Sequence, residues 1–118
     1  MAGASTGGEH HFTVGLVSVE VGAGGDGAPA VVKLSGELDI ASASEVTAAL
    51  TALLTGGHDV VVDMGGLRFC DSTGFAAFVR ARNIADEQGR TFTLRRPQTN
   101  VGRAMAFAGL NDVFVIED

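Results

Sequence analysis

The feature that most constrains the fold is the regular alternation of strand-length apolar runs with longer segments of helical spacing after Ala30. Apolar runs typical of strands occupy residues 30–34, 59–64, 91–94 and 113–116. Between them, apolar residues recur every three to four positions in segments that begin near residues 42, 72 and 99. Strands that alternate with helices pair in parallel through right-handed crossovers. The pattern therefore predicts an α/β fold built on a mostly parallel sheet.

The chain before Ala30 has a different pattern. Apolar residues alternate over residues 11–21, but the phase shifts by one near Leu16, which we interpret as a β-bulge within one strand. The Gly-rich run at residues 22–27 predicts a flexible hairpin connection. Because only a loop separates the first strand from the second, we expect these two strands to pair antiparallel.

Length and composition narrow the class of protein. The 118 residues suit one domain, and the sequence predicts a disordered tail over residues 1–9 and a single domain over residues 10–118. No apolar run approaches the roughly 18 residues that a membrane helix needs. The net charge of −6 disfavours binding to nucleic acid or an anionic membrane. The single cysteine, Cys70, excludes an internal disulfide framework. We expect a cytoplasmic protein.

Capping residues predict the helix ends. Ser42 and Glu45 fit a capping box at the start of the first helix. The third helix is expected after Pro97, with Thr99 or Asn100 as its cap. Glycines in the expected places would end the three helices, at Gly56-Gly57, Gly89 and Gly109.

The segment over residues 69–75, Phe-Cys-Asp-Ser-Thr-Gly-Phe, is the strongest candidate site. It follows the carboxyl end of a central strand and opens a helix, which is where α/β folds place their functional sites. Asp71 and Ser72 are favoured helix caps and Gly74 permits close backbone approach, so a structural cap is one interpretation. In the other, the Ser72 hydroxyl lies among free amides at the positive end of the helix dipole, a place that accepts a phosphate.

Three motifs in this order make the chain similar to STAS domains of the anti-sigma factor antagonist family. They are Leu34-Ser35-Gly36-Glu37-Leu38-Asp39, then Val61-Val62-Asp63 followed by Phe69-Cys70-Asp71-Ser72-Thr73-Gly74, then Ala108-Gly109-Leu110. The similarity covers roughly residues 12–115. It implies a single STAS-like domain with a mixed sheet of about five strands, the first antiparallel and the rest mainly parallel, and helices largely on one face.

The resemblance also implies a function. In that family, the serine directly after the aspartate is phosphorylated by a partner that is both an anti-sigma factor and a serine kinase, and here that position is Ser72. The unphosphorylated protein would bind this partner and release a sigma factor, and a serine phosphatase would reverse the modification. The contact residues implied by the two neighbouring motifs are Gly36, Glu37, Leu38, Asp39, Asp71, Thr73, Gly74 and Phe75.

Other functions stay open at this point. The same fold could serve as a STAS subunit of another assembly, such as a stress-signalling scaffold or a lipid-transport complex. A hydrolase with Ser72 as nucleophile would lack both the Gly-x-Ser-x-Gly motif and an assignable histidine base, so we expect no enzyme.

Metal and cofactor sites have weaker signals. His10, His11 and His58 lack metal-ligand spacing on one element. Asp39, Asp63 and Asp71 could in principle gather around Mg²⁺, but the first and third have contact or cap interpretations and there is no P-loop lysine. Cys70 is expected to be a small buried hydrophobe. We therefore expect neither a metal nor a cofactor.

Overall fold

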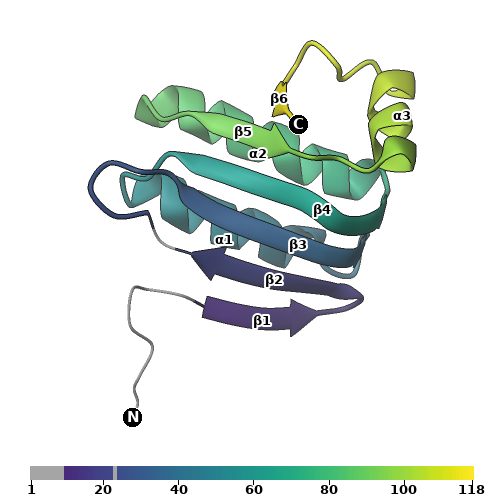
Figure 1. Ribbon diagram of the computed structural model, residues 1–118, viewed down its shortest axis with the longest axis horizontal. Helices are drawn as coiled ribbons and strands as arrows, with labels where there is room; N and C mark the ends of the chain where they lie inside the picture. The colour runs from purple at the N-terminus through teal and green to yellow at the C-terminus, as the bar shows by residue number, and fades with distance from the viewer. Residues whose placement is uncertain (1–9, 23) are drawn as a thin grey trace.

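The computed structural model describes residues 10–22 and 24–118, so the predicted tail over residues 1–9 lies outside the described residues (Figure 1). In this part of the chain, six strands and three helices follow one another. The strands are β1 (His10–Val14), β2 (Val17–Gly22), β3 (Ala30–Leu38), β4 (Val60–Cys70), β5 (Phe92–Arg95) and β6 (Val115–Glu117). The helices are α1 (Ala43–Thr55), α2 (Ser72–Gln88) and α3 (Thr99–Phe107).

The strands form one mixed sheet in the order β1-β2-β3-β4-β5-β6 (Figure 1). The pairs β1–β2 and β2–β3 are antiparallel, and the pairs from β3 to β6 are parallel. Helices α1 and α2 lie side by side on one face of the sheet, and α3 lies beyond the carboxyl end of β5. The predicted α/β class, the antiparallel start and the mainly parallel remainder are confirmed.

The prediction of a single bulged strand over residues 11–21 was wrong. This segment forms the hairpin β1–β2, with Val14 paired with Val17 across a turn at Gly15 and Leu16. Gly15 has a φ of 57°, the left-handed conformation that tight hairpin turns require. A two-residue turn places its flanking residues on the same face, so it shifts the apolar alternation by one as a bulge does. The sheet consequently has six strands rather than about five.

Strands β3 and β4 run further than the sequence predicted. β3 continues through Leu38, and β4 passes through Gly65-Gly66 to Cys70. The two strands pair from Ala30 opposite Val60 to Leu38 opposite Cys70, with two register shifts on the way. Their carboxyl ends therefore bring the Gly-Glu-Leu-Asp and Asp-Ser-Thr-Gly motifs to the same edge of the sheet.

Helix α1 starts after Ser42 as predicted but lacks the predicted capping bond, and the predicted cap of α3 was wrong. The Ser42 hydroxyl turns back toward the Asp39 carbonyl oxygen at 3.4 Å and makes no capping bond to α1. The cap of α3 is Gln98, whose side-chain amide donates to the Gly65 carbonyl oxygen at 2.8 Å. The glycine stops are confirmed, since left-handed glycines end all three helices, at Gly57, Gly89 and Gly109.

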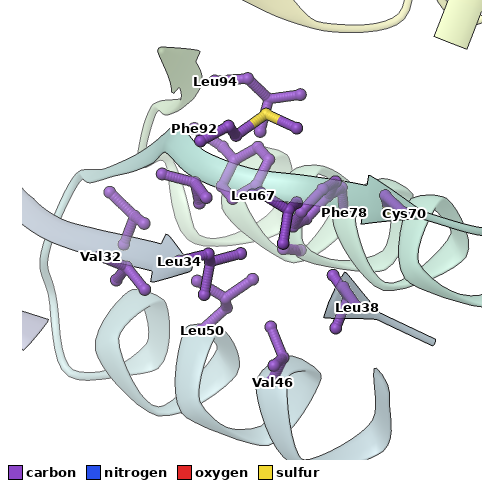
Figure 2. Packing of buried hydrophobic residues seen from close by; sticks show 14 of the residues in the cluster. Val32, Leu34, Leu38, Val46, Leu50, Leu67, Cys70, Phe78, Phe92 and Leu94 are labelled. Atoms are coloured by element: carbon purple, nitrogen blue, oxygen red, sulfur yellow. The ribbon is translucent and has the colours of Figure 1, made fainter. Parts of the chain in front are cut away.

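The core lies between the sheet and the α1–α2 pair. Side chains from β3, β4, α1 and α2 point toward one another there, among them Leu34, Leu50, Leu67 and Phe78 (Figure 2). Each is at most 1% exposed, and burying a side chain of this size contributes about 1.5–3 kcal/mol. Within residues 10–22 and 24–118, no helix is long and apolar enough to cross a membrane.

Candidate functional site

Asp71 is the cap of α2 and organises the first turn of that helix. Its Oδ1 accepts hydrogen bonds from the Thr73 hydroxyl at 2.5 Å, the Thr73 amide at 3.0 Å and the Gly74 amide at 3.1 Å. Hydrogen bonds to the ionised form, with that of the Thr73 hydroxyl the largest, hold the pKa of Asp71 below its ordinary value. A fixed negative charge therefore lies at the positive end of the α2 dipole.

Ser72 and Thr73 carry neighbouring hydroxyls in different situations. Ser72 is the first residue of α2 and is exposed, and its hydroxyl has no hydrogen-bond partner among the described residues. The Thr73 hydroxyl is half-buried and donates to the Asp71 carboxylate. The Ser72 hydroxyl is thus the one that an incoming protein can reach without breaking an existing bond.

Gly74 permits the closest approach in the site. A Cβ at this position would lie 2.5 Å from Cys70 Sγ and 2.9 Å from Leu38 Cγ, distances at which atoms clash. Nearby, the Asp71 amide donates to the Leu38 carbonyl oxygen at 3.2 Å. The start of α2 is therefore fixed directly against the end of β3.

The Gly-Glu-Leu-Asp motif is anchored to the β1–β2 turn. Gly36 has a φ of 102°, and a Cβ there would lie 2.2 Å from the Leu16 carbonyl oxygen. That same oxygen accepts a hydrogen bond from the Glu37 amide at 2.9 Å. Beyond Glu37, the Asp39 carboxylate accepts a hydrogen bond from the Ala41 amide at 3.0 Å. The three segments that meet at this edge thus fix one another through the backbone.

The predicted contact residues divide by burial. Ser72 is exposed, and Gly36, Glu37, Asp39, Asp71 and Thr73 are half-buried. Leu38, Gly74 and Phe75 are buried. In this conformation the buried three support the surface from below, whereas the other six lie where another molecule can touch them.

Three exposed apolar side chains at this edge are not among the predicted contact residues, although one of them, Phe69, belongs to the candidate segment over residues 69–75. Leu16, Ile40 and Phe69 are 63%, 79% and 46% exposed. Leu16 lies in the β1–β2 turn, Ile40 directly follows Asp39, and Phe69 is paired with Glu37. The available signals were a large aliphatic residue beside the turn glycine, at Leu16, and another directly after the loop aspartate, at Ile40. We call Leu16, Glu37, Asp39, Ile40, Phe69 and Ser72 the Ser72 surface.

The other titratable groups do not join this surface. Burial alone would raise the pKa of Asp63, but hydrogen bonds from Arg96 (2.6 Å) and the Gly65 amide (2.9 Å) lower it. Burial raises the pKa of the Cys70 thiol to about 12, so this thiol is protonated and unreactive at neutral pH. Among the described residues, no three His, Cys, Asp or Glu side chains are grouped to hold a metal ion.

The histidines lie far from Ser72. His58 precedes β4 and Ser72 follows it, and a strand of this length spans on the order of 35 Å. His10 is paired with Val21, which is paired with Val32 near the amino end of β3. No histidine of the described chain is thus positioned as a base for Ser72 in this conformation.

Comparison with known proteins identifies the family of this chain. Residues 21–117 match the family model described as "Mlab, STAS domain", so the chain belongs to the STAS domain family. A curated relative from Staphylococcus epidermidis, named "Anti-sigma-B factor antagonist", is 27% identical over 88 residues, covering 74% of this chain and 82% of the relative. The family resemblance of the sequence motifs is confirmed.

Solved structures share the fold. An anti-sigma factor antagonist from Mycobacterium paratuberculosis has a TM-score of 0.75 at 22% identity, covering 86% of this chain and 85% of its own. The phosphorylated form of SpoIIAA, described as a Bacillus cell fate determinant, has a TM-score of 0.65 at 18% identity, covering 83% of this chain and 89% of its own. At these identities the similarity establishes the architecture.

Proposed function

We propose that this protein is an anti-sigma factor antagonist whose unmodified Ser72 surface binds an anti-sigma factor with serine kinase activity, so that a sigma factor is released. The observation that carries the proposal is the Ser72 hydroxyl, which is exposed at the start of α2, directly after the capping Asp71, and has no hydrogen-bond partner among the described residues. The name of the Staphylococcus epidermidis relative supports the role, and the phosphorylated form of SpoIIAA supports a phosphate switch on this fold.

Ser72 is the phosphoacceptor in this proposal, and Thr73 is not. Phosphorylation of Thr73 would first have to break its 2.5 Å hydrogen bond to Asp71 and would place a phosphate against that carboxylate. A phosphate on Ser72 would instead be partly stabilised by the amides and dipole of α2. The modification therefore costs the free protein little stability.

The switch acts on the complex. A phosphate adds about −1.5 to −2 charges beside Asp71. A bound kinase brings nucleotide phosphates or acidic groups close to the serine that it modifies, and like charges juxtaposed at an interface cost several kcal/mol. Phosphorylated protein thus leaves the anti-sigma factor, and a serine phosphatase restores binding. On this proposal residues 10–118 form a non-enzymatic regulatory domain that acts in the cytoplasm without a cofactor.

The test uses Ser72→Ala and Ser72→Glu proteins as baits in lysate of the organism that encodes the chain. A protein retained by the alanine variant and lost by the glutamate variant is identified, produced separately and incubated with wild-type protein and ATP. We expect one phosphate, mapped by mass spectrometry to Ser72, and none on Ser72→Ala. Thr73→Ala should still be phosphorylated on Ser72. Phosphate on Thr73, or equal affinity of the two Ser72 variants, would contradict the proposal.

A second candidate is a STAS subunit of another assembly, such as a stress-signalling scaffold or a lipid-transport complex. It is favoured by the description of the matching family model, which names "Mlab, STAS domain" and no anti-sigma factor. In that case the baits should recover a stable complex that Ser72→Glu does not disrupt and that contains no kinase.

A further inference from the structure

A groove opens beside Ser72, between the first turns of α1 and α2. One wall is formed by Ile40, Ser44 and Thr47, and the other by Thr73, Ala76 and Arg80. The Ile40 side chain, 79% exposed, lies at the groove and also belongs to the Ser72 surface. The groove is therefore continuous with the surface proposed above to bind the anti-sigma factor.

Arg80 gives this groove its charge. Among the described residues that line it, Arg80 is the one charged side chain. Of the six other arginines of the described chain, five lie within 4 Å of a carboxylate, namely Arg68, Arg82, Arg90, Arg95 and Arg96. The sixth, Arg103 on α3, also lacks an ion pair within the described residues but does not line the groove. Arg80 makes neither an ion pair nor a side-chain hydrogen bond within residues 10–22 and 24–118. An unpaired cation in a chain of net charge −6 favours an acidic occupant.

The spacing along α2 relates Arg80 to the phosphoacceptor. Ser72, Ala76 and Arg80 are separated by four residues each, so they lie along one stripe of the helix, and all three are exposed. The Cα atoms of Ser72 and Arg80 are about 12 Å apart along the axis. Long helical side chains tend to lean toward the helix amino terminus, which on this stripe is the direction of Ala76 and Ser72.

We propose that this groove receives a segment of the anti-sigma factor that places an aliphatic side chain against Ile40 and Ala76 and a carboxylate on Arg80. This inference rests on the proposed function and adds to it the chemistry of the docking segment and a residue that selects the partner. It also explains how a phosphate on Ser72 weakens binding, since that negative charge would lie on the same stripe and oppose the incoming carboxylate. Arg80 is then a specificity-determining residue outside both sequence motifs.

The test compares Arg80 with Arg82 on the same helix. Arg82 is a matched control because its replacement makes the same charge change on α2, while its side chain lines a different hollow, with Asp86 and Phe92. The probe is the anti-sigma factor recovered by the Ser72→Ala bait, titrated with each variant in low and high salt. Unchanged melting temperatures verify that the exposed substitutions leave the fold intact.

We expect Arg80→Ala to weaken binding about tenfold and Arg80→Glu about 100-fold in low salt, with a smaller loss in high salt. Arg82→Ala and Arg82→Glu should change the affinity less than about threefold, as expected for a charge outside the contact. Replacing the partner's carboxylate by a lysine should restore binding to Arg80→Glu and to no other variant. On titration of the labelled protein, amide resonances of Ile40, Ser44 and Thr47 should shift.

The outcomes distinguish a failure of this inference from a failure of the proposed function on which it rests. If the Ser72 variants behave as proposed but Arg80→Glu binds as tightly as Arg82→Glu, the groove does not receive the partner and only this inference is overturned. If the recovered complex is insensitive to Ser72→Glu, or no anti-sigma factor is recovered, the proposed function fails and this inference fails with it.

Discussion

Asp63 lies on β4 and Asp71 directly follows it, yet the two carboxylates have opposite surroundings. Asp63 is buried on the strand and is neutralised by a cation, the Arg96 guanidinium, at 2.6 Å. Asp71 follows the strand, is held by three hydrogen bonds from neutral groups, and keeps its charge beside the exposed Ser72. One strand thus positions two carboxylates. We call the Asp63–Arg96 ion pair, which stabilises the fold, the closed pair, and we call the Asp71–Ser72 end, which stays accessible for the proposed regulation, the open end.

The largest expected effect is at Ser72, where a substitution should weaken binding strongly and leave the stability of the fold almost unchanged. Ser72→Glu should weaken binding of the anti-sigma factor by about 100- to 1000-fold, which corresponds to roughly 3–4 kcal/mol. The free energy of unfolding should change by less than about 0.5 kcal/mol, because the residue is exposed and an acidic side chain is favourable in the first turn of a helix. Calorimetric titration and urea unfolding measure the two quantities, with Ala48→Glu as an exposed control on α1 that lies outside the groove beside α2.

The next largest effect is the difference in stability lost when each of the glycines near the two aspartates is replaced by alanine. Gly74→Ala should cost about 3 kcal/mol of stability, because its Cβ would lie 2.5 Å from Cys70 Sγ within the packed core. Gly65→Ala should cost less than about 1 kcal/mol, since its nearest neighbours, at 3.2 Å, are the ends of the Arg96 and Asp63 side chains, which need to move by only a few tenths of an ångström. Similar losses in urea unfolding for both variants would mean that the approach at Gly74 is not the tighter one.

A smaller effect tests the closed pair itself. Asp63→Ala should cost about 1–3 kcal/mol, because the Gly65 amide and Arg96 lose their acceptor. Asp71→Asn should cost less than about 1 kcal/mol, because asparagine caps helices nearly as well as aspartate. In combination with Arg96→Ala, the loss from Asp63→Ala should shrink, whereas that from Asp71→Asn should stay the same.

The smallest effect is a pH dependence shared by both carboxylates. Each has a pKa lowered from its ordinary value of 3.8, so each contributes stability that is complete above that value. The contribution disappears as the pH falls through the lower pKa of the folded state. Unfolding measured from pH 7 downward should therefore show a loss of stability below about pH 4 that Asp63→Asn reduces. An identical acid profile for wild type and Asp63→Asn would exclude a contribution from this pair.

The sequence was informative where one physical signal dominated. Apolar periodicity identified the parallel strands and the buried helix faces, and the left-handed glycines at the helix ends were readable because no other residue adopts that conformation as easily. The order of the motifs indicated the family and the edge where Asp71 and Ser72 lie. These features depend on local residues, which is why they could be predicted.

Several other features could not be predicted from the sequence. The hairpin at Gly15 was mistaken for a bulge because both shift the alternation alike. Ser42 and Gln98 bond to Asp39 and Gly65, partners that no capping pattern shows. Ile40, like the groove along α2 that ends at Arg80, is found only when α1 and α2 lie side by side. In each case the partner that a residue meets in the folded chain, whether near or distant in sequence, decided the outcome rather than the residue type.

The close approach at Gly74 has a consequence for how signals travel through this fold. The amino end of α2 touches Cys70 and Leu38 without room for one more carbon atom, and the Asp71 amide is bonded to β3. A packed contact of this kind has no second arrangement available at low cost. On the proposed function, a phosphate on Ser72 would therefore meet a rigid support and would act on a partner as a change in surface charge on one unaltered backbone. Reversal would then require only hydrolysis, with no refolding step to delay the return to the binding state.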